Sequence, residues 1–192
     1  MAQELELKVT VDSEEFDRCL SALQTHTGQA GDTYVQVNYY FDTPDFALSQ
    51  ARSMLRVRSK KGRLFLQYKS KRSRNGGMLL CEELEAELPE LPREVNPRDY
   101  FPQAPDLLCT LRGDLVTWRT DFALPGAVVS LDRSIYFGRT DLEIEIEGES
   151  EAIEVAAAFL NPHGKSEGGN GKFSRFVKAY RAYYTDRKGE ET

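Results

Sequence analysis

Segments in which charged and apolar residues strictly alternate recur along this chain, and the sign of the charge changes from one segment to the next. In the first of them Glu4, Glu6 and Lys8 share one face of a predicted strand while Leu5 and Leu7 share the other, because successive side chains of a strand point to opposite faces. Two carboxylates placed in this way form a hard-oxygen site suited to Mg²⁺ or Mn²⁺. For one strand alone, an ordinary strand with a solvated charged face is the better interpretation. The recurrence of the pattern is what favours a functional charged face.

The next patterned segments are basic. Arg56 and Arg58 alternate with apolar residues, a Lys-Lys-Gly turn follows, and Lys69 lies on the polar face of the returning strand, with no acidic residue between positions 52 and 74. A basic surface hairpin that touches RNA is a serious alternative for the lysines and arginines in the turns. It explains Arg56, Arg58 and Lys69 less well, because these three occupy one face of paired strands.

Two acidic segments follow the basic hairpin. In the first, Glu83, Glu85 and Glu87 alternate with apolar residues, and either Glu83 and Glu85 or Glu85 and Glu87 could form the functional pair. The second segment, residues 141–147, carries four carboxylates on one face and three aliphatic residues on the other. Like charges stacked on a free sheet face repel one another. A bound cation or an opposing basic strand would replace this repulsion with an attractive interaction.

Composition narrows the class of protein. The 192 residues suffice for one domain, and the formal net charge of −6 argues against a general nucleic-acid binder. The three cysteines form no C-x-x-C pair, which fits a reducing cytoplasm without a disulfide framework. There is no apolar run of membrane-spanning length and no signal peptide. We therefore expect a cytoplasmic protein with no membrane partner.

The pattern of segments predicts an α+β protein built around a barrel. Alternating strands fill most of the chain, while residues 12–23, 150–160 and 172–184 have the apolar spacing of helices, and residues 106–112 are predicted as a short helix ended by Gly113. A closed antiparallel barrel would turn the charged faces inward and leave the apolar faces to be covered by helices. Arg and Lys in such a lumen bind phosphate oxygens, and carboxylates hold a divalent cation. The matching ligand is a metal–polyphosphate complex.

Several motifs in order resemble the triphosphate tunnel metalloenzymes of the CYTH superfamily, and most closely its small stand-alone bacterial members. The motifs are Glu4-x-Glu6-x-Lys8, Tyr40-Phe41-Asp42-Thr43-Pro44, Leu55-Arg56-Val57-Arg58 with Lys69, Glu83-x-Glu85, Arg119, Asp141-Leu142-Glu143-Ile144-Glu145 and Lys172. Two departures thin the cationic wall of that family: Thr117 stands where many members carry a second basic residue, and Leu80 or Cys81 where an arginine often precedes the acidic pair.

The resemblance implies an eight-stranded antiparallel β-barrel with helices packed outside, formed by one domain over residues 1–186 and followed by a frayed charged tail at 187–192. It also implies a metal-dependent phosphohydrolase acting on triphosphates, with an inorganic triphosphatase as the first expectation. The alternatives are an adenylyl cyclase, a thiamine or nucleoside triphosphatase, and a non-catalytic polyphosphate- or nucleotide-binding module. The expected partner is a triphosphate-containing small molecule, and nucleic acid is not expected, with RNA 5′-triphosphate ends as the one exception left open.

The resemblance assigns roles to the charged residues. The residues expected to hold Mg²⁺ or Mn²⁺ are Glu4, Glu6, Glu143, Glu145 and Glu147. Those expected to bind the phosphates are Lys8, Arg56, Arg58, Lys69, Arg119 and Lys172. Lys8 and Glu6 are the predicted catalytic residues, and Glu83 and Glu85 form a supporting acidic pair.

Overall fold

The strands form one antiparallel sheet. The computed structural model describes residues 2–75, 78–166 and 171–188, with side chains over 5–70, 83–164 and 171–184. The strands are β1 (Ala2–Val11), β2 (Asp32–Asp42), β3 (Ser53–Lys60), β4 (Arg63–Asn75), β5 (Met78–Leu88), β6 (Glu94–Val95), β7 (Cys109–Leu124), β8 (Ala127–Tyr136), β9 (Arg139–Gly148) and β10 (Lys165–Ser166). The helices are α1 (Ser13–Thr27), α2 (Ala47–Gln50), a 3₁₀ turn η1 (Pro97–Asp99), α3 (Ser150–Leu160) and α4 (Lys172–Lys188).

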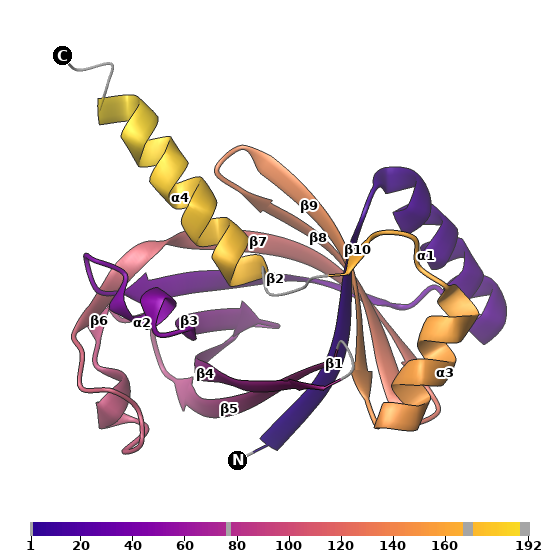
Figure 1. Cartoon of the computed structure of the whole chain (residues 1–192), viewed down its shortest axis with the longest axis horizontal. Coiled ribbons are helices and arrows are strands. Elements are labelled where there is room, and N and C mark those ends of the chain that lie inside the picture. Colours follow the sequence, from indigo (N-terminus) through magenta and orange to yellow (C-terminus); the bar gives the residue numbers. More distant parts are fainter. Residues whose placement is uncertain (1, 76–77, 167–170, 189–192) are drawn as a thin grey trace.

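Eight of these strands pair in a ring (Figure 1). Their order is β1-β5-β4-β3-β2-β7-β8-β9, and β9 pairs back onto β1. β1 closes the ring by dividing its length, since Ala2–Glu6 pairs with β5 and Glu6–Val11 pairs with β9. The short strands β6 and β10 are additions to β7 and β1. The predicted eight-stranded antiparallel barrel is confirmed.

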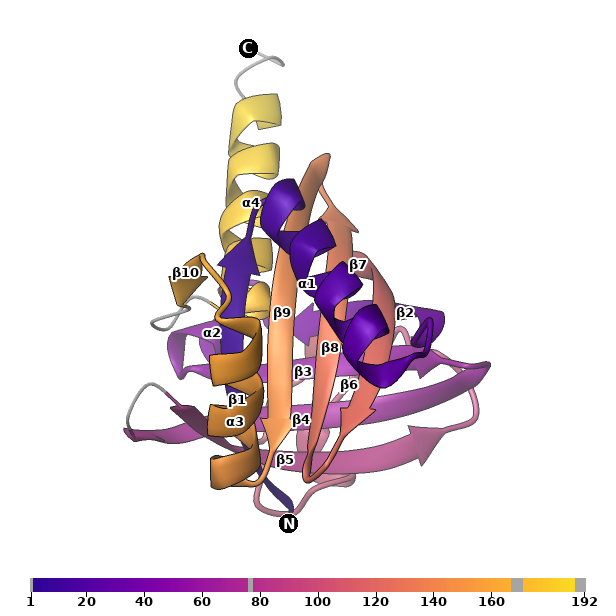
Figure 2. The same ribbon diagram turned by 90° about the vertical axis from the view of Figure 1, so that its right-hand side faces the viewer.

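Two helices cover one side of the ring from outside. In Figure 2, α1 and α3 lie in front of β1, β8 and β9, and they share a core with the outward-facing aliphatic residues of those strands. α1 begins as predicted, because the Asp12 side chain accepts a hydrogen bond from the Glu15 N–H at 2.9 Å. It ends where Gly28 adopts a left-handed conformation with φ of 67°. None of the helices in the described part of the chain combines the length and the apolar character needed to cross a membrane.

A second core covers the opposite side of the ring, where residues 95–109 pack on the outer faces of β3, β4 and β5. The helix predicted over residues 106–112 is wrong, because β7 begins at Cys109 and runs through this stretch. Gly113 lies inside the strand with φ of 151°, at a shift of register between β2 and β7. A Cβ atom there would lie 3.1 Å from the Phe176 ring, so the glycine serves a close approach to α4 rather than a helix end.

The Tyr40-Phe41-Asp42-Thr43-Pro44 segment shapes the connection from β2 to β3. Asp42 is fully buried, and its carboxylate accepts hydrogen bonds from the N–H groups of Leu48 and Ser49 at 3.0 Å each. This carboxylate caps α2, which returns the chain into β3. The aspartate of the motif therefore has a structural role.

α4 packs against one end of the lumen. Tyr40, Met54, Leu115 and Tyr136 occupy the inward rows of β2, β3, β7 and β8, and they form an apolar cluster with Phe176 of α4. The inward rows are polar along the middle of the ring and apolar where α4 begins. α4 extends to Lys188, and residues 189–192 of the predicted tail lie outside the described part of the chain.

Candidate functional site

Three carboxylates meet on the inward faces of β8 and β9. Asp132 and Glu143 are direct partners in the β8–β9 ladder, and Glu145 lies two residues further along β9. One carboxylate oxygen from each residue lies within 4.8 Å of the others. Asp132 and Glu143 are fully buried and Glu145 is 9% exposed. Strand alternation places all three in the lumen, since the residues between them are core aliphatics.

The ε-ammonium of Lys172, at the start of α4, lies among these three carboxylates. Its Nζ is 2.9 Å from Glu143 and 3.0 Å from Glu145, and it also pairs with Asp132. Burial alone would lower the pKa of Lys172, but the three carboxylates outweigh it and raise the pKa well above its usual value. A cation thus already sits where three hard oxygen ligands converge. This donor set fits Mg²⁺ or Mn²⁺.

Two arginines surround the carboxylate cluster. Arg119 donates two hydrogen bonds of 2.6 Å to Asp132 and one of 2.6 Å to Glu145. Arg175 of α4 lies 2.9 Å from Glu143. Burial by itself would raise the pKa values of Asp132 and Glu145, but Lys172 and the neighbouring cations outweigh it and hold both below their usual values. Both carboxyl groups are therefore ionised at neutral pH.

The inward face of β1 continues the cluster. Lys8 Nζ lies 2.9 Å from Glu6 and 3.5 Å from Glu145. Burial would lower the pKa of Lys8, but Glu145 and Glu6 raise it above the ordinary value. Glu147 belongs to the same row of β9 but is exposed. The side chain of Glu4 lies outside the described side chains.

The cations of β3 have a different environment. Arg56 Nε donates to Gln67 Oε1 at 2.6 Å, and Arg58 Nε donates to Asn38 Oδ1 at 2.9 Å. Within the described side chains, neither guanidinium forms an ion pair with a carboxylate. Burial, reinforced by Arg56 and Arg119, lowers the pKa of Arg58 to about 10. Cations that form no ion pair with a described carboxylate in a partly buried lumen form a site that favours an anion.

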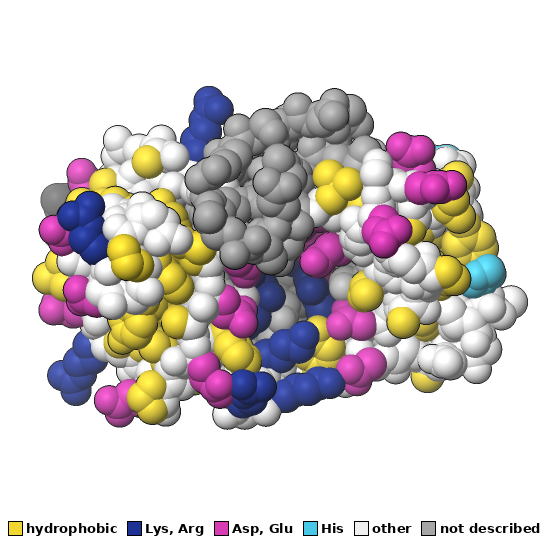
Figure 3. Space-filling view, turned by 90° about the horizontal axis from the view of Figure 1, so that it is seen from below, with side chains coloured by type: hydrophobic (Ala, Val, Ile, Leu, Met, Phe, Trp, Pro, Cys, Tyr) yellow, Lys and Arg dark blue, Asp and Glu magenta, His cyan; other side chains and the backbone are white. Residues whose placement is uncertain are grey.

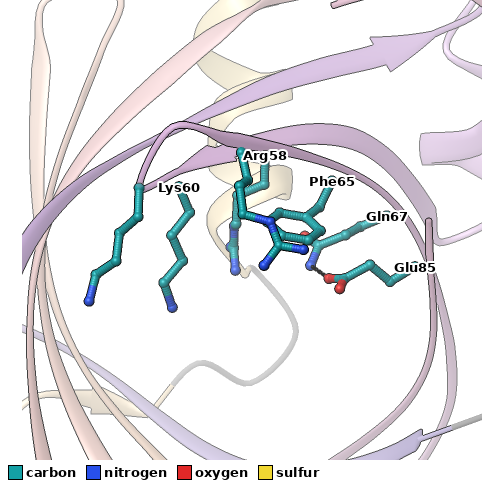
Figure 4. A pocket seen from close by; sticks show the side chains of 7 residues that line it. Arg58, Lys60, Phe65, Gln67 and Glu85 are labelled. Carbon is teal, nitrogen blue, oxygen red and sulfur yellow. Dashed lines mark hydrogen bonds between the residues drawn. The ribbon is translucent and has the colours of Figure 1, made fainter. Parts of the chain in front are cut away.

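Arg56 and Arg58 form a cationic wall on the inward face of β3, and the outer part of this wall lines a cavity. Its volume is about 360 Å³, and its lining is Arg58, Lys60, Lys61, Arg63, Phe65, Gln67 and Glu85. Figure 4 shows Arg58 and Lys60 extending from the wall into the enclosed space beside Phe65, with Gln67 bonded to Glu85. In Figure 3 the Lys and Arg side chains gather in a hollow that acidic side chains flank. The cavity is therefore predominantly cationic.

The predicted acidic pair supports the cationic wall from β5. Glu83 pairs with Lys69, and Glu85 accepts a 2.6 Å hydrogen bond from Gln67. Glu87 continues the row and pairs with Arg63, and both Glu85 and Glu87 are exposed. The structure thus places Glu83 and Glu85 beside the inward residues of β4.

The structure brings together the predicted residues in two groups that differ from the expected division. Arg119 and Lys172, expected with the phosphate-binding cations, lie against the carboxylates. Sequence reasoning missed Asp132, Arg175, Asn38 and Gln67. Alternation was a usable signal for Asp132, which stands between the inward Ser130 and Ser134 of β8 and follows the core residue Leu131.

The chain is similar to proteins of known sequence and structure. It is 32% identical over 158 residues to "Putative triphosphatase YjbK" of Bacillus subtilis (strain 168), covering 77% of this chain and 79% of that protein. A crystal structure from Bacillus halodurans, described as a putative adenylate cyclase, matches with 27% identity and a TM-score of 0.69 over 92% of this chain and 99% of the other.

A third comparison concerns the fold alone. The structure of HpAC1 from Hippeastrum, described as a putative adenylyl cyclase with a dominant triphosphatase activity, matches with 21% identity and a TM-score of 0.63. It covers 93% of this chain and 96% of that one. The family model of the CYTH domain matches residues 2–175, which include every residue of the carboxylate cluster and of the cationic wall. The chain belongs to the CYTH domain family.

Proposed function

We propose that this protein is a metal-dependent triphosphatase and that inorganic tripolyphosphate is its first substrate to test. The proposal is supported by membership of the CYTH family, by the triphosphatase name of the relative YjbK, and by the chemistry of the lumen. The reaction would release the terminal phosphate by attack of water on its phosphorus, with diphosphate leaving from the opposite side.

The observation that carries the proposal is the pairing of two opposite sites in one lumen. Asp132, Glu143 and Glu145 form a carboxylate cluster on β8 and β9, whereas Arg56 and Arg58 on β3 have no carboxylate partner among the described side chains. A cation binder alone needs no unpaired arginines, and an anion binder alone needs no carboxylate cluster. A metal–polyphosphate complex satisfies both.

The carboxylate cluster would hold the divalent cation, with Glu6 of β1 next to it through Lys8. When bound, Mg²⁺ or Mn²⁺ would neutralise charge on the phosphate oxygens and make the phosphorus more electrophilic. Lys172 occupies this place as an ammonium ion, so it would have to leave the cluster. An ammonium released there is free to bind a phosphate oxygen, which reconciles its position with the role that the sequence predicted.

The cationic wall would hold the phosphate chain. Arg56 and Arg58 are anchored through Nε by Gln67 and Asn38, which leaves their terminal nitrogens to bind oxygens of the substrate. Lys69 and Arg119 would extend this contact on either side. These groups align the phosphorus with water and stabilise charge that moves to the leaving group.

The carboxylates are poor general bases. The pKa values of Asp132 and Glu145 are lowered, so these groups have little tendency to take a proton from water. The rate enhancement would therefore come from positioning and from charge neutralisation, as is general for phosphoryl transfer. Lys8, held by Glu6 and Glu145, would contact the reacting phosphate.

The test is a panel of substrates with one readout. Phosphate release is measured from tripolyphosphate, ATP and thiamine triphosphate with Mg²⁺, with Mn²⁺ and with excess EDTA, and cyclic AMP is measured in the ATP reactions. We expect metal-dependent release from tripolyphosphate and none in EDTA. Unchanged turnover in EDTA would contradict the metal site, and cyclic AMP without phosphate release would replace hydrolysis by cyclisation.

A further inference from the structure

Three polar side chains on the inward face of β2, those of Gln36, Asn38 and Tyr40, have atoms with no partner in the described part of the chain. Asn38 is fully buried and Tyr40 is 1% exposed. Asn38 Nδ2 and the Tyr40 hydroxyl make no hydrogen bond within the described part of the chain. Buried polar atoms nearly always have partners, so each exception needs a reason. Gln36 Oε1 is an acceptor, whereas Asn38 Nδ2 and the Tyr40 hydroxyl are both donors at successive inward positions, which indicates a shared reason for these two.

Both side chains lie beside the unpaired arginines. In the β2–β3 ladder, Asn38 is opposite Arg58 and Tyr40 is opposite Arg56. The 2.9 Å bond from Arg58 Nε to Asn38 Oδ1 fixes the orientation of the amide, because only the oxygen accepts a hydrogen bond. The amide therefore presents its NH₂ group as a donor. The Tyr40 ring is held by Phe176 and Phe173, with ring centroids 4.6 and 5.0 Å apart.

We propose that Asn38 and Tyr40 are substrate-binding residues that add two neutral hydrogen-bond donors to the phosphate-binding wall of Arg56 and Arg58. The proposal rests on the proposed function of this lumen. It names as ligand a phosphoryl group whose oxygens accept from both guanidinium groups and from both neutral donors. Donors next to cations that form no ion pair with a described carboxylate suit an anion with several acceptor oxygens.

Burial of these atoms sets a condition on binding. Each has almost no surface accessible to solvent in the ligand-free protein, so an anion reaches them only when the neighbouring arginine side chains move toward it. A phosphoryl group attracts both guanidinium groups. Hydrogen bonds made in such a dry site are stronger than bonds made in water.

The variant Tyr40→Phe tests the proposal most directly, because it removes the hydroxyl and keeps the ring. Binding of tripolyphosphate is measured by calorimetry in EDTA, where no metal supports hydrolysis. Loss of one hydrogen bond to a charged group predicts an affinity roughly 10- to 100-fold lower. The thermal midpoint without ligand stays the same or rises, because an unsatisfied buried hydroxyl is lost.

The matched control is Tyr39→Phe. Tyr39 is the next residue of β2, faces outward and packs in the second core, so the same chemical change there leaves the affinity unchanged. Asn38→Asp is the second variant. Its carboxylate would pair with Arg58, so the thermal midpoint without ligand rises while tripolyphosphate binding falls further than in Tyr40→Phe.

The outcomes separate the two proposals. If the wild type binds and Tyr40→Phe and Asn38→Asp bind equally well, the two residues are structural and the inference is wrong, while the proposed function stands. If the wild type binds tripolyphosphate neither in EDTA nor with Mg²⁺, both the proposed function and the inference are wrong. A low thermal midpoint of both variants would also overturn the inference, because it identifies structural residues.

Discussion

Replacing Arg58 by methionine should weaken substrate binding without weakening the empty protein. Methionine keeps an unbranched chain in place of the aliphatic part of arginine and removes the charge. Burial, with Arg56 and Arg119 nearby, lowers the pKa of Arg58 to about 10. The difference from the ordinary arginine value exceeds two powers of ten, and each power is worth about 1.36 kcal/mol, so retaining the charge costs roughly 3 kcal/mol.

Two corrections reduce this figure. Arg58 is partly exposed to the lumen, and water there screens the charge, so about 1–3 kcal/mol is the realistic cost. Replacing Arg58 also leaves Asn38 Oδ1 without a hydrogen-bond donor, which costs about 1 kcal/mol of stability. We expect Arg58→Met to leave the free energy of unfolding unchanged or raised by up to about 2 kcal/mol, with the thermal midpoint rising about 2–4 °C per kcal/mol.

The measurement is urea unfolding and tripolyphosphate calorimetry near neutral pH. Since the folded-state pKa lies below the unfolded value, the penalty is present in full at every pH below about 10. Affinity should fall about 10- to 100-fold through loss of a charge-assisted contact. The control is Arg133→Met on the outward face of β8, which should change neither quantity appreciably. A loss of more than about 1 kcal/mol of stability in Arg58→Met would refute the reasoning.

Three further predictions concern the carboxylates. Glu6→Gln should shift the metal titration of activity to higher concentration, with little change in the tripolyphosphate titration or in metal-free thermal unfolding; an unchanged metal titration would remove Glu6 from the site. Lys172→Gln leaves the buried carboxylates with less compensating positive charge. Urea unfolding without metal should therefore show a free energy of unfolding roughly 3 kcal/mol lower, and added Mn²⁺ should restore it. Wild-type stability of the metal-free variant would contradict this. Hydrogen bonds from Arg18 lower the pKa of Glu15 to about 2; burial opposes this shift and the His163 N–H adds to it. The ionised Glu15 therefore stabilises the fold above about pH 4.5, and this stabilisation is lost as the pH falls toward 2. Glu15→Gln should therefore cost about 1–3 kcal/mol at neutral pH, after discounting for the exposure of Arg18, and almost nothing near pH 2; equal costs in urea unfolding at both pH values would contradict the assignment.

The barrel could be predicted because alternation is a local property. The rows that contain Arg56, Glu143 and Glu145 follow from the two-residue period of a strand, which a sequence displays directly. Gly113 misled the prediction because a glycine that ends a helix and one that admits a neighbouring ring look alike in sequence. The glycine is needed because a Cβ atom at this position would lie 3.1 Å from the Phe176 ring. Phe176 is 63 residues further along the chain.

The division of the charges could not be predicted from the sequence. Lys172 and Arg119 carry the same sign as Arg56, and nothing local indicates that they face carboxylates. That distinction depends on which strands are neighbours in the ring. Asp132 was overlooked for a related reason, since it is the one charged residue on the inward face of β8, and its part in a carboxylate cluster depends on Glu143 beside it.

The divided pairing of β1 has a consequence for how the chain folds. The strand made first during synthesis must pair with β9, which is made much later: Glu6 is opposite Glu147. A contact of such long separation in sequence carries a large loop-closure entropy and slows folding. Until β9 emerges, the second half of β1 lacks its neighbour and offers free backbone groups to other chains. Aggregation during synthesis, rather than instability of the finished ring, is therefore the foreseeable weakness of this architecture, and variants that weaken the β1–β9 seam should lower the yield of folded protein before they lower its thermal midpoint.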